Sequence, residues 1–417
     1  MTGSTPSNTG PRARTHWFAM ALAATAPLGC GPTTDADAPD DGPLEVAASD
    51  VRVLGTTPEL AVVLDLEVLP DGRVWVINSA PPYFVGFDPD GTLIAAHGQE
   101  GGGPEEFRMP AGFVTGGLDG EAWTFDVRRH ALIRVSAPDD AWRDVGLPRA
   151  TLPPGTVQGG MDFMSPVVRT ARLGSGVVVP HSTGTLQSGV FTLVESILKA
   201  DLMRFDPATG TVDSILSLGT ALDDPFVGFE AVAGGFPLWK RLWAVCGGDH
   251  LRVYDRVRNQ LRGFDANGAE LEPVALPPTG LEEVSAHDFA RAVFLLRQAE
   301  ATGGVGSRLS PEDSLRLING MAAELSGEPS QLAAYLPAFV DFRCTEGGTM
   351  WLRPLDLDRG GLQGARAWLR VEPDGGTRRV TLPERFDPLR FTDDRVWGVL
   401  RDDFDVASVA WAPLPPT

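Results

Sequence analysis

The chain has 417 residues, and its 48 glycines and 35 prolines separate many short apolar runs, which favours numerous strands joined by turns over several compact α/β domains. A formal net charge of -20 excludes a nucleic-acid-binding protein, because phosphate backbones require clustered Lys and Arg and the sequence has no such cluster. We therefore expect one closed all-β body, whose acidic surface keeps it soluble and favours neutral or cationic partners over anionic membranes.

Residues 1–29 have the composition of a signal peptide. Arg12 and Arg14 form a positive region, and the apolar stretch 17–28 is too short to span a bilayer. Its end, Pro27-Leu28-Gly29-Cys30, resembles the bacterial lipoprotein signal, in which a cysteine is diacylated and becomes the mature N-terminus. We therefore expect an exported protein, periplasmic or on the cell surface, that is anchored to a membrane through lipid on Cys30. An ordinary secretory peptide with an unmodified cysteine is the alternative.

Residues 30–43 are rich in Asp, Pro and Thr and contain almost no apolar side chains. Such a segment cannot bury enough apolar surface to offset the entropy that folding removes. We predict a disordered tether here, and a folded body over residues 44–417.

A turn pair followed two residues later by an apolar residue and tryptophan recurs along the folded body. The clear copies are at 71–75, 119–123, 347–351 and 393–397, with weaker ones at 174–178 and 248–252. Six copies predict a repeat architecture, because such a unit buries its apolar face only against its neighbours. The tryptophans hold a fixed place in the repeated strand, so we interpret them as core between units rather than as a binding cage.

A second strand pattern follows in each unit, with alternating apolar and polar residues that end in a tight turn; the clearest copies are at 85–91, 203–207, 261–268 and 368–375. The alternation and the turns predict a four-stranded antiparallel meander in every unit. Units begin near Leu60, Ala111, Val167, Leu238, Ala338 and Pro388. The sequence therefore predicts an all-β fold, a six-bladed β-propeller of four-stranded antiparallel blades. The last unit is short, and we expect a strand within 44–54 to complete it and close the ring.

Between the fourth and fifth units the strand pattern gives way to helical spacing. Apolar residues recur at helical intervals in two runs within 281–336, and Ser285 and Ser310 are suited to the two helix starts. We predict a helical insertion between blades 4 and 5, over about residues 281–336. Such an insertion suits either a cap over one end of the ring or a cover for apolar surface on its rim.

The glycine-rich segment 98–110 ends in Gly-Pro-Glu-Glu-Phe and a proline, and is followed by Asp119-Gly120 and Phe125-Asp126. This arrangement resembles the NHL-repeat signature. The chain over 44–414 resembles the bacterial family of exported six-bladed β-propellers related to NHL-repeat proteins, most specifically in its first two units. The resemblance implies a fold and a compartment more than an activity. We interpret the glycine run as a connection between blades and not as a phosphate loop, because no Lys-Ser or Lys-Thr follows it.

The sequence contains no ordered catalytic motif. Its six histidines lack the spacings of zinc ligands, and no serine lies in a nucleophile elbow. The acidic residues expected near the ring axis are Glu67, Asp162 and Asp341, and they are the candidate ligands for a divalent metal, Ca or Zn. No catalytic or cofactor-binding residue is predicted.

The chain has two cysteines besides Cys30. Cys246 and Cys344 both precede the turn before the second strand, in units four and five respectively. In an oxidising compartment they could form a disulfide that links two blades. The alternative is a pair of buried thiols that lie farther apart than the ~4.4–6.8 Å that a bridge allows between Cα atoms.

Two classes of function are compatible with these features. We favour a non-catalytic binding or scaffold module of the cell envelope, a monomer that recognises a protein, peptide or glycan, because packing alone explains the repeats. The alternative is a metal-dependent propeller hydrolase, similar to the gluconolactonase-like enzymes, with a divalent metal on the ring axis.

Overall fold

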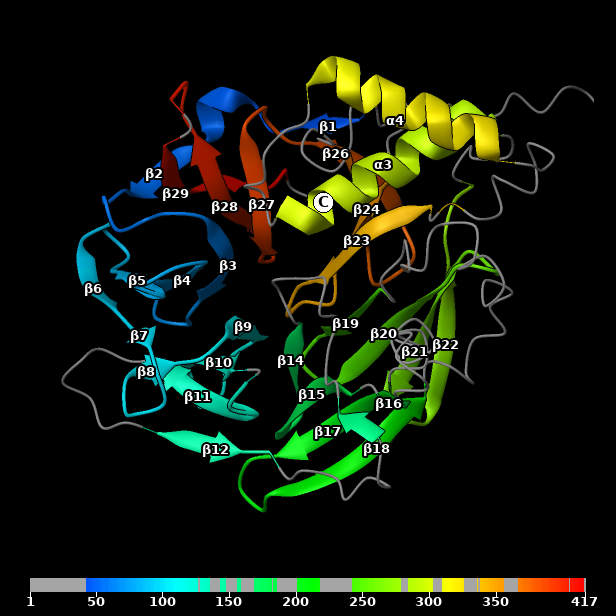
Figure 1. Cartoon of the computed structure of the whole chain (residues 1–417). Helices are drawn as coiled ribbons and strands as arrows, with labels where there is room; N and C mark the ends of the chain where they lie inside the picture. Colours follow the sequence, from blue (N-terminus) through cyan, green and yellow to red (C-terminus); the bar gives the residue numbers. More distant parts are fainter. Residues whose placement is uncertain are drawn as a thin grey trace, which may run out of the picture. The chain divides into compact units, whose positions relative to one another are not determined.

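A computed structural model describes the chain over residues 43–126, 128–135, 143–147, 156–158, 169–181, 183–185, 201–217, 242–278, 284–302, 310–325, 336, 338–355, 367–404 and 406–415. All described residues belong to one compact unit, Asp41–Thr417 (Figure 1). The predicted signal peptide, the lipidation site Cys30 and nearly all of the predicted tether lie outside the described residues. Among the helices of the described part, none is long and apolar enough to cross a membrane.

Three of the sheets have four antiparallel strands each. The first consists of β3 (Val63–Val68), β4 (Val74–Asn78), β5 (Phe84–Phe87) and β6 (Leu93–His97). The second consists of β19 (Trp243–Cys246), β20 (His250–Asp255), β21 (Gln260–Asp265) and β22 (Glu270–Ala275). The third joins β27 (Phe386–Phe391), β28 (Arg395–Arg401) and β29 (Ala407–Pro413) to the N-terminal β2 (Arg52–Gly55).

Two larger sheets complete the body. The five-stranded sheet contains the antiparallel strands β23 (Phe339–Cys344), β24 (Met350–Pro354), β25 (Ala367–Val371) and β26 (Thr377–Thr381), with β1 (Leu44–Glu45) parallel to β26. The eight-stranded sheet contains two antiparallel runs: β9 (Pro110–Thr115), β10 (Ala122–Asp126), β11 (Ala131–Val135), β12 (Asp144–Gly146), and then β14 (Thr170–Leu173), β15 (Gly176–His181), β17 (Asp201–Asp206), β18 (Thr211–Ser217). Two short pairs are β7 (Gln99–Glu100) with β8 (Glu106–Phe107), and β13 (Thr156–Gln158) with β16 (Thr183–Thr185).

The all-β class is confirmed, but the strand pairing does not give six separate four-stranded sheets. The two runs of the eight-stranded sheet are joined because β9 and β14 pair in parallel, with Val114 opposite Thr170 and Thr115 opposite Ala171. The sequence pattern predicted each antiparallel run and had no means of showing that two first strands approach closely enough to bond directly.

The first strands of these antiparallel runs form a closed series of neighbours. Along the chain, β3 contacts β9, β9 contacts β14, β14 contacts β19, β19 contacts β23, β23 contacts β27, and β27 contacts β3 again. The arrangement is propeller-like, with these inner strands around a common centre and the later strands of each run farther out (Figure 1).

The repeated tryptophans lie between neighbouring runs, as predicted. Trp75, Trp123 and Trp351 are each at most 1 % exposed. Trp75 packs in one apolar cluster with Phe107 of β8 and Phe113 of β9. Trp351 stacks on Phe391 of β27, with 4.4 Å between ring centroids. The tryptophans therefore supply the apolar contacts between runs.

The termini meet through β2. This strand pairs antiparallel with β29, with Arg52 opposite Trp411 and Val53 opposite Ala410. The predicted closure by a strand within 44–54 is confirmed. β1 of the same segment pairs instead with β26 of the preceding sheet, so the N-terminal segment joins two sheets.

Two helices, α3 (Ala286–Thr302) and α4 (Pro311–Glu324), follow β22 in the chain and precede β23. The hydroxyl of Ser285 accepts a hydrogen bond from the Asp288 amide, and the Ser310 hydroxyl accepts one from the Asp313 amide, each at 3.1 Å. These contacts satisfy amides at the two helix starts that would otherwise lack partners. The helices contact one another and share an apolar cluster with Leu355, which follows β24.

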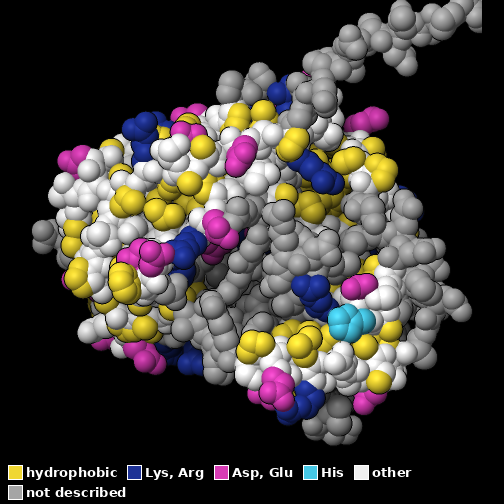
Figure 2. Space-filling model, turned by 90° about the horizontal axis from the view of Figure 1, so that it is seen from above, with side chains coloured by type: hydrophobic (Ala, Val, Ile, Leu, Met, Phe, Trp, Pro, Cys, Tyr) yellow, Lys and Arg dark blue, Asp and Glu magenta, His cyan; other side chains and the backbone are white. Residues whose placement is uncertain are grey.

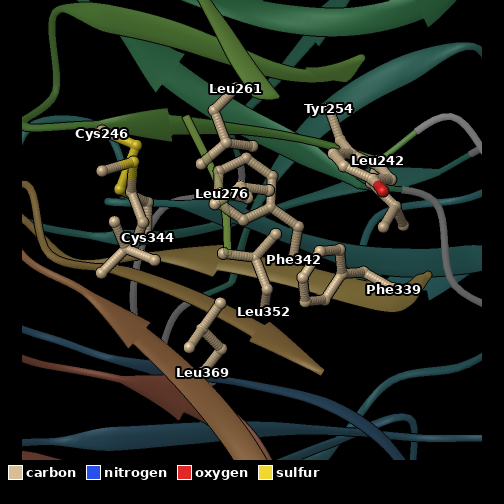
Figure 3. Packing of buried hydrophobic residues seen from close by; sticks show 12 residues of the cluster. Leu242, Cys246, Tyr254, Leu261, Leu276, Phe339, Phe342, Cys344, Leu352 and Leu369 are labelled. Carbon is tan, nitrogen blue, oxygen red and sulfur yellow. A yellow bond between two sulfur atoms is a disulfide. The ribbon is translucent and has the colours of Figure 1, made fainter. Parts of the chain in front are cut away.

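A disulfide joins Cys246, the last residue of β19, to Cys344, the last residue of β23. Their Cα atoms are 5.1 Å apart, which lies within the range that a bridge requires. Figure 3 shows the bond at one end of an apolar cluster to which the β19–β22 sheet and the β23–β25 strands both contribute. The bond therefore links two neighbouring inner strands across 98 residues of sequence.

The surface mixes charge and apolar groups. On the face in Figure 2, basic and acidic side chains are interspersed with apolar ones and neither sign covers it. Large apolar side chains are exposed at separate places, among them Phe404 between β28 and β29 and Leu315 on α4. Such scattered exposure is normal for a soluble protein.

The contact between β2 and the first sheet predicts a difference between two glycine substitutions. Gly91 and Gly120 both have positive φ, +87° and +76°, but a Cβ at Gly91 would overlap the Leu54 carbonyl oxygen of β2, whereas a Cβ at Gly120 would meet no atom within 4 Å. The free energy of unfolding should fall by about 1–2 kcal/mol in both alanine variants, because alanine is strained in the left-handed backbone conformation. Gly91→Ala should lose about 1–3 kcal/mol more, because β2 must shift. Urea denaturation measures both, and equal losses would contradict the described position of β2.

Candidate functional site

Charged side chains gather on three consecutive inner strands. They are Asp65 and Glu67 on β3, Asp341 and Arg343 on β23, and Asp387 and Arg390 on β27, joined by Arg169 immediately before β14. We call these seven residues the inner-strand cluster: Asp65, Glu67, Arg169, Asp341, Arg343, Asp387 and Arg390. Glu67 and Asp341 are buried, whereas Asp387 is exposed and the others are intermediate.

The members of the cluster occupy equivalent places in the repeat. Glu67 pairs across the sheet with Trp75, Arg343 with Trp351, and Arg390 with Trp397. The three aspartates stand opposite the residue two positions after each tryptophan: Asp65 opposite Ile77, Asp341 opposite Arg353 and Asp387 opposite Val399. The repeat thus places an aspartate and a longer charged side chain at matching heights on three neighbouring strands.

Glu67 connects β3 to strands on both sides. Its Oε1 accepts hydrogen bonds from the Gly116 amide, just after β9, and from Nη2 of Arg390 on β27, each at 3.1 Å. Burial raises the pKa of Glu67 from its ordinary 4.5 to about 7; Arg390 opposes that rise and the nearby Asp65 adds to it. Glu67 is therefore a carboxyl that exchanges its proton near neutral pH.

Asp65 has a similar role two residues earlier on the same strand. Its Oδ2 accepts from the Phe113 amide of β9 and its Oδ1 from the amide of Leu66, each at 2.9 Å. Burial raises the pKa of Asp65, although the attraction of Arg343 and Arg390 opposes the rise. Together Asp65 and Glu67 accept hydrogen bonds from two amides, that of Phe113 in β9 and that of Gly116 just after β9.

Asp341 is held by two arginines. It forms an ion pair with Nη2 of Arg169 and a second, at 3.3 Å, with Nε of Arg343, and its Oδ1 accepts from the Phe342 amide at 2.7 Å. Burial alone would raise the pKa of Asp341, but Arg169, Arg343 and Arg353 together hold it far below its ordinary value. Arg169 also donates from Nη1 to the Phe342 carbonyl at 2.6 Å, so it links the start of β14 to β23.

The predicted metal ligands do not fit a divalent cation. Glu67 and Asp341 lie on inner strands as expected, but each is already bonded to a guanidinium group, which repels a cation at the same oxygens. Asp162 lies outside the described residues. Within the described part of the chain, no group of three or more His, Cys, Asp or Glu side chains is placed to hold a metal.

Sequence reasoning missed the arginines of the cluster. Arg169, Arg343 and Arg390 were not predicted, because metal ligands and nucleophiles are carboxylate, imidazole, thiol or hydroxyl groups and arginine is none of these. A usable signal was present: Asp-x-Glu at 65–67, Asp-x-Arg at 341–343 and Asp-x-x-Arg at 387–390 precede three of the four tryptophan phrases by a similar distance.

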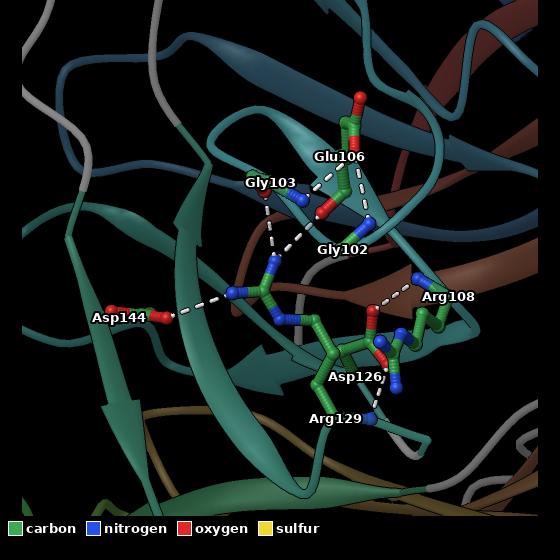
Figure 4. A network of polar contacts seen from close by, with 7 residues as sticks. All are labelled: Gly102, Gly103, Glu106, Arg108, Asp126, Arg129 and Asp144. Carbon is green, nitrogen blue, oxygen red and sulfur yellow. Dashed lines mark hydrogen bonds and ion pairs between the residues drawn. The ribbon is translucent and has the colours of Figure 1, made fainter.

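The glycine-rich segment 98–110 is held by hydrogen bonds within it and by others to Arg129 (Figure 4). The Glu106 carboxylate accepts from the amides of Gly102 and Gly103 at 2.8 and 2.7 Å, and these bonds lower the pKa of Glu106. Arg129 donates from Nη1 to the carbonyls of Gly103 and Glu106. The amides that a phosphate loop would offer are therefore already engaged, which agrees with the interpretation of this segment as a connection between sheets.

No protein-family model matches the chain, and no curated protein matches it. Several solved structures are similar to it. Virginiamycin B lyase from Staphylococcus aureus, an inactive variant with quinupristin, is 12 % identical over 86 % of this chain and 83 % of its own, with a TM-score of 0.41. A gluconolactonase from Xanthomonas campestris is 12 % identical over 90 % and 96 %, with a TM-score of 0.41. A Bacteroides fragilis protein inferred to be exported is 12 % identical over 90 % and 99 %, with a TM-score of 0.47.

The environment of Glu67 predicts a pH-dependent stability difference between the wild type and Glu67→Gln. Because the folded state holds the Glu67 proton more tightly than the unfolded chain, this group makes wild-type stability fall as pH rises from 4.5 to about 7. Glutamine does not titrate, so the variant should gain up to about 3 kcal/mol relative to the wild type across that window.

Chemical denaturation at a series of pH values measures this difference. The exposed carboxylate variant Glu312→Gln, on α4, is the matched control and should follow the wild type. If the free energy of unfolding of Glu67→Gln minus that of the wild type stays constant or falls as pH rises, the described burial of Glu67 is contradicted.

Proposed function

We propose that the chain is an exported six-bladed β-propeller of the cell envelope that binds a ligand and catalyses no reaction. The blade count rests on the closed series of β3, β9, β14, β19, β23 and β27, taken as one inner strand per blade. On this view the eight-stranded sheet is two neighbouring blades whose inner strands share two residue pairs. The helices α3 and α4 then belong to an insertion between blades 4 and 5.

One observation carries the choice of a binding module over a metal-dependent hydrolase. The acidic residues of the inner strands are bonded to arginines and to backbone amides. Glu67 forms an ion pair with Arg390, and Asp341 forms ion pairs with Arg169 and Arg343. A catalytic divalent ion needs several carboxylate, amide or imidazole ligands directed at one point. A set of paired charges, some of which reach solvent, suits recognition of a polar ligand instead.

The ligand would be a protein, peptide or glycan of the envelope, bound by a monomer. The mixed charges on the face in Figure 2 support neutral or zwitterionic partners over polyanions. The NHL-like connection at 98–110 and the lipoprotein-type end of the signal segment at Cys30 support export and anchoring.

Lactone hydrolysis tests the proposal against its alternative. With glucono-δ-lactone and added Ca²⁺ or Zn²⁺, the wild type and Asp341→Asn should both leave the reaction at its uncatalysed rate, because Asp341 is held by arginines and not by a metal. Metal-stimulated turnover in the wild type that Asp341→Asn abolishes would establish the hydrolase.

Labelling with radioactive palmitate tests the anchor. In a bacterial host, label and membrane association should depend on Cys30 and should be lost in Cys30→Ala. The control Cys344→Ala changes a cysteine of the folded body and should keep the label. Label that persists in Cys30→Ala would contradict lipidation at this residue.

A further inference from the structure

We propose that the inner-strand cluster binds a single carboxylate group, held between Arg343 and Arg390, and that binding is accompanied by proton uptake at Glu67. This inference deepens the proposed function, on which it rests, by naming the chemistry of the ligand.

The two arginines lie at matching positions on adjacent strands. Arg343 on β23 and Arg390 on β27 each face the tryptophan of their own sheet, and β23 contacts β27. Both guanidinium groups act electrostatically on Asp65, so both lie within range of one carboxylate of β3. Two guanidinium groups from neighbouring strands can hold the two oxygens of one carboxylate.

Both groups keep hydrogen-bond donors that no described residue accepts. Arg390 donates from Nη2 to Glu67, and Arg343 contacts Asp341 through Nε and Nη2 at 3.3–3.4 Å. Within the described part of the chain, Nη1 of either arginine donates to no protein acceptor, although a guanidinium carries five N–H groups. The Arg343 side chain is 22 % exposed and that of Arg390 is 13 % exposed, so solvent reaches them.

The charge around the arginines favours a monoanion. Four carboxylates and four guanidinium groups interact here and cancel when all are ionised: Asp65, Glu67, Asp341, Asp387, and Arg169, Arg343, Arg353, Arg390. At the edge, Glu346 acts on Glu67 and Arg401 acts on Asp387, which adds one charge of each sign. A bound carboxylate adds one negative charge, whereas a phosphate dianion adds two in a poorly solvated site.

Glu67 can compensate for one added negative charge. The charged groups that face it are Arg390 from β27, Asp65 from its own strand and Glu346 after β23, and the Gly116 amide donates to it from beyond β9. A proton taken from solvent converts its carboxylate to a carboxylic acid, which weakens its hold on Arg390 and frees that guanidinium for the ligand. The pKa of about 7 places this exchange in the physiological range.

Calorimetric titration of the intact protein tests the proposal. The probes are N-acetyl-L-alanine, its neutral carboxamide and inorganic phosphate. The carboxylate should bind at about pH 6, where Glu67 already holds its proton, and about 10-fold more weakly at about pH 8, where net proton uptake is detected by the dependence of the heat on buffer ionisation. Glu67→Gln should abolish the proton uptake. Equal binding of acid and carboxamide, or tighter binding of phosphate, would overturn the proposal.

Arginine variants locate the site. Arg343→Gln and Arg390→Lys should each weaken carboxylate binding about 10-fold or more, since each removes a charge-assisted or forked contact. Arg390→Lys keeps the charge beside Glu67 and so guards against a folding defect, which thermal melting checks. Arg316→Gln, on the exposed face of α4, should bind like the wild type. Undiminished binding by both cluster variants would overturn the assignment.

The same titrations distinguish a peptide C-terminus from a free small acid. They also distinguish failure of this inference from failure of the proposed function. A tripeptide that binds more tightly than N-acetyl-L-alanine, and loses binding when its C-terminus is amidated, supports a peptide carboxyl terminus as ligand; equal binding supports a free small acid. Absence of carboxylate binding, with no metal-dependent lactone turnover, would overturn this inference and leave the binding module standing. Lactone turnover lost in Asp341→Asn would overturn the proposed function itself.

Discussion

The structure depends on how the inner edge of each sheet is completed. An inner strand has a bonded neighbour on one side only, and its remaining amides and carbonyls need partners because the interior offers little water. Three solutions occur here. β9 and β14 pair directly in parallel; carboxylates of β3 accept from the amides of Phe113 and Gly116 at β9; and Arg169 donates to the Phe342 carbonyl of β23. The tryptophans pack the runs together, and these polar contacts join β3 to β9, β9 to β14, and the residue before β14 to β23.

The charged groups that serve these edges also form the candidate site. Glu67 binds an amide near β9 and an arginine on β27, and Asp341 binds arginines from two strands, so a change in the charge of either alters contacts between strands. Burial opposes ionisation of Asp65 and Glu67, whereas the arginines around Asp341 favour its ionised form. The cluster therefore has some groups with fixed charge and others that accept a proton, an arrangement that couples ligand charge to protonation.

Much of the fold could be predicted from the sequence, because turn pairs, alternation and tryptophans are local signals that repeat. The closure of the last sheet by 44–54 followed from its short length, and β2 confirms it. The parallel pairing of β9 with β14 could not be predicted, since nothing in either strand encodes its distance from the other. For the site, Glu67 and Asp341 lie on inner strands as the sequence predicts, and their role as metal ligands stays a prediction. Their pairing with Arg390 and Arg169 joins residues 323 and 172 positions apart, which no local motif can encode.

We propose that the inner carboxylates bind arginines and strand-edge amides rather than a metal ion. Elemental analysis of the intact protein, purified without chelators and dialysed exhaustively, tests it most directly. We expect no calcium or zinc near one ion per chain, in the wild type and in Asp341→Asn alike, because Oε1 of Glu67 and both carboxylate oxygens of Asp341 already accept from guanidinium groups or amides. About one ion per wild-type chain that Asp341→Asn or Glu67→Gln fails to retain would contradict it, and would place a metal where the ion pairs are described.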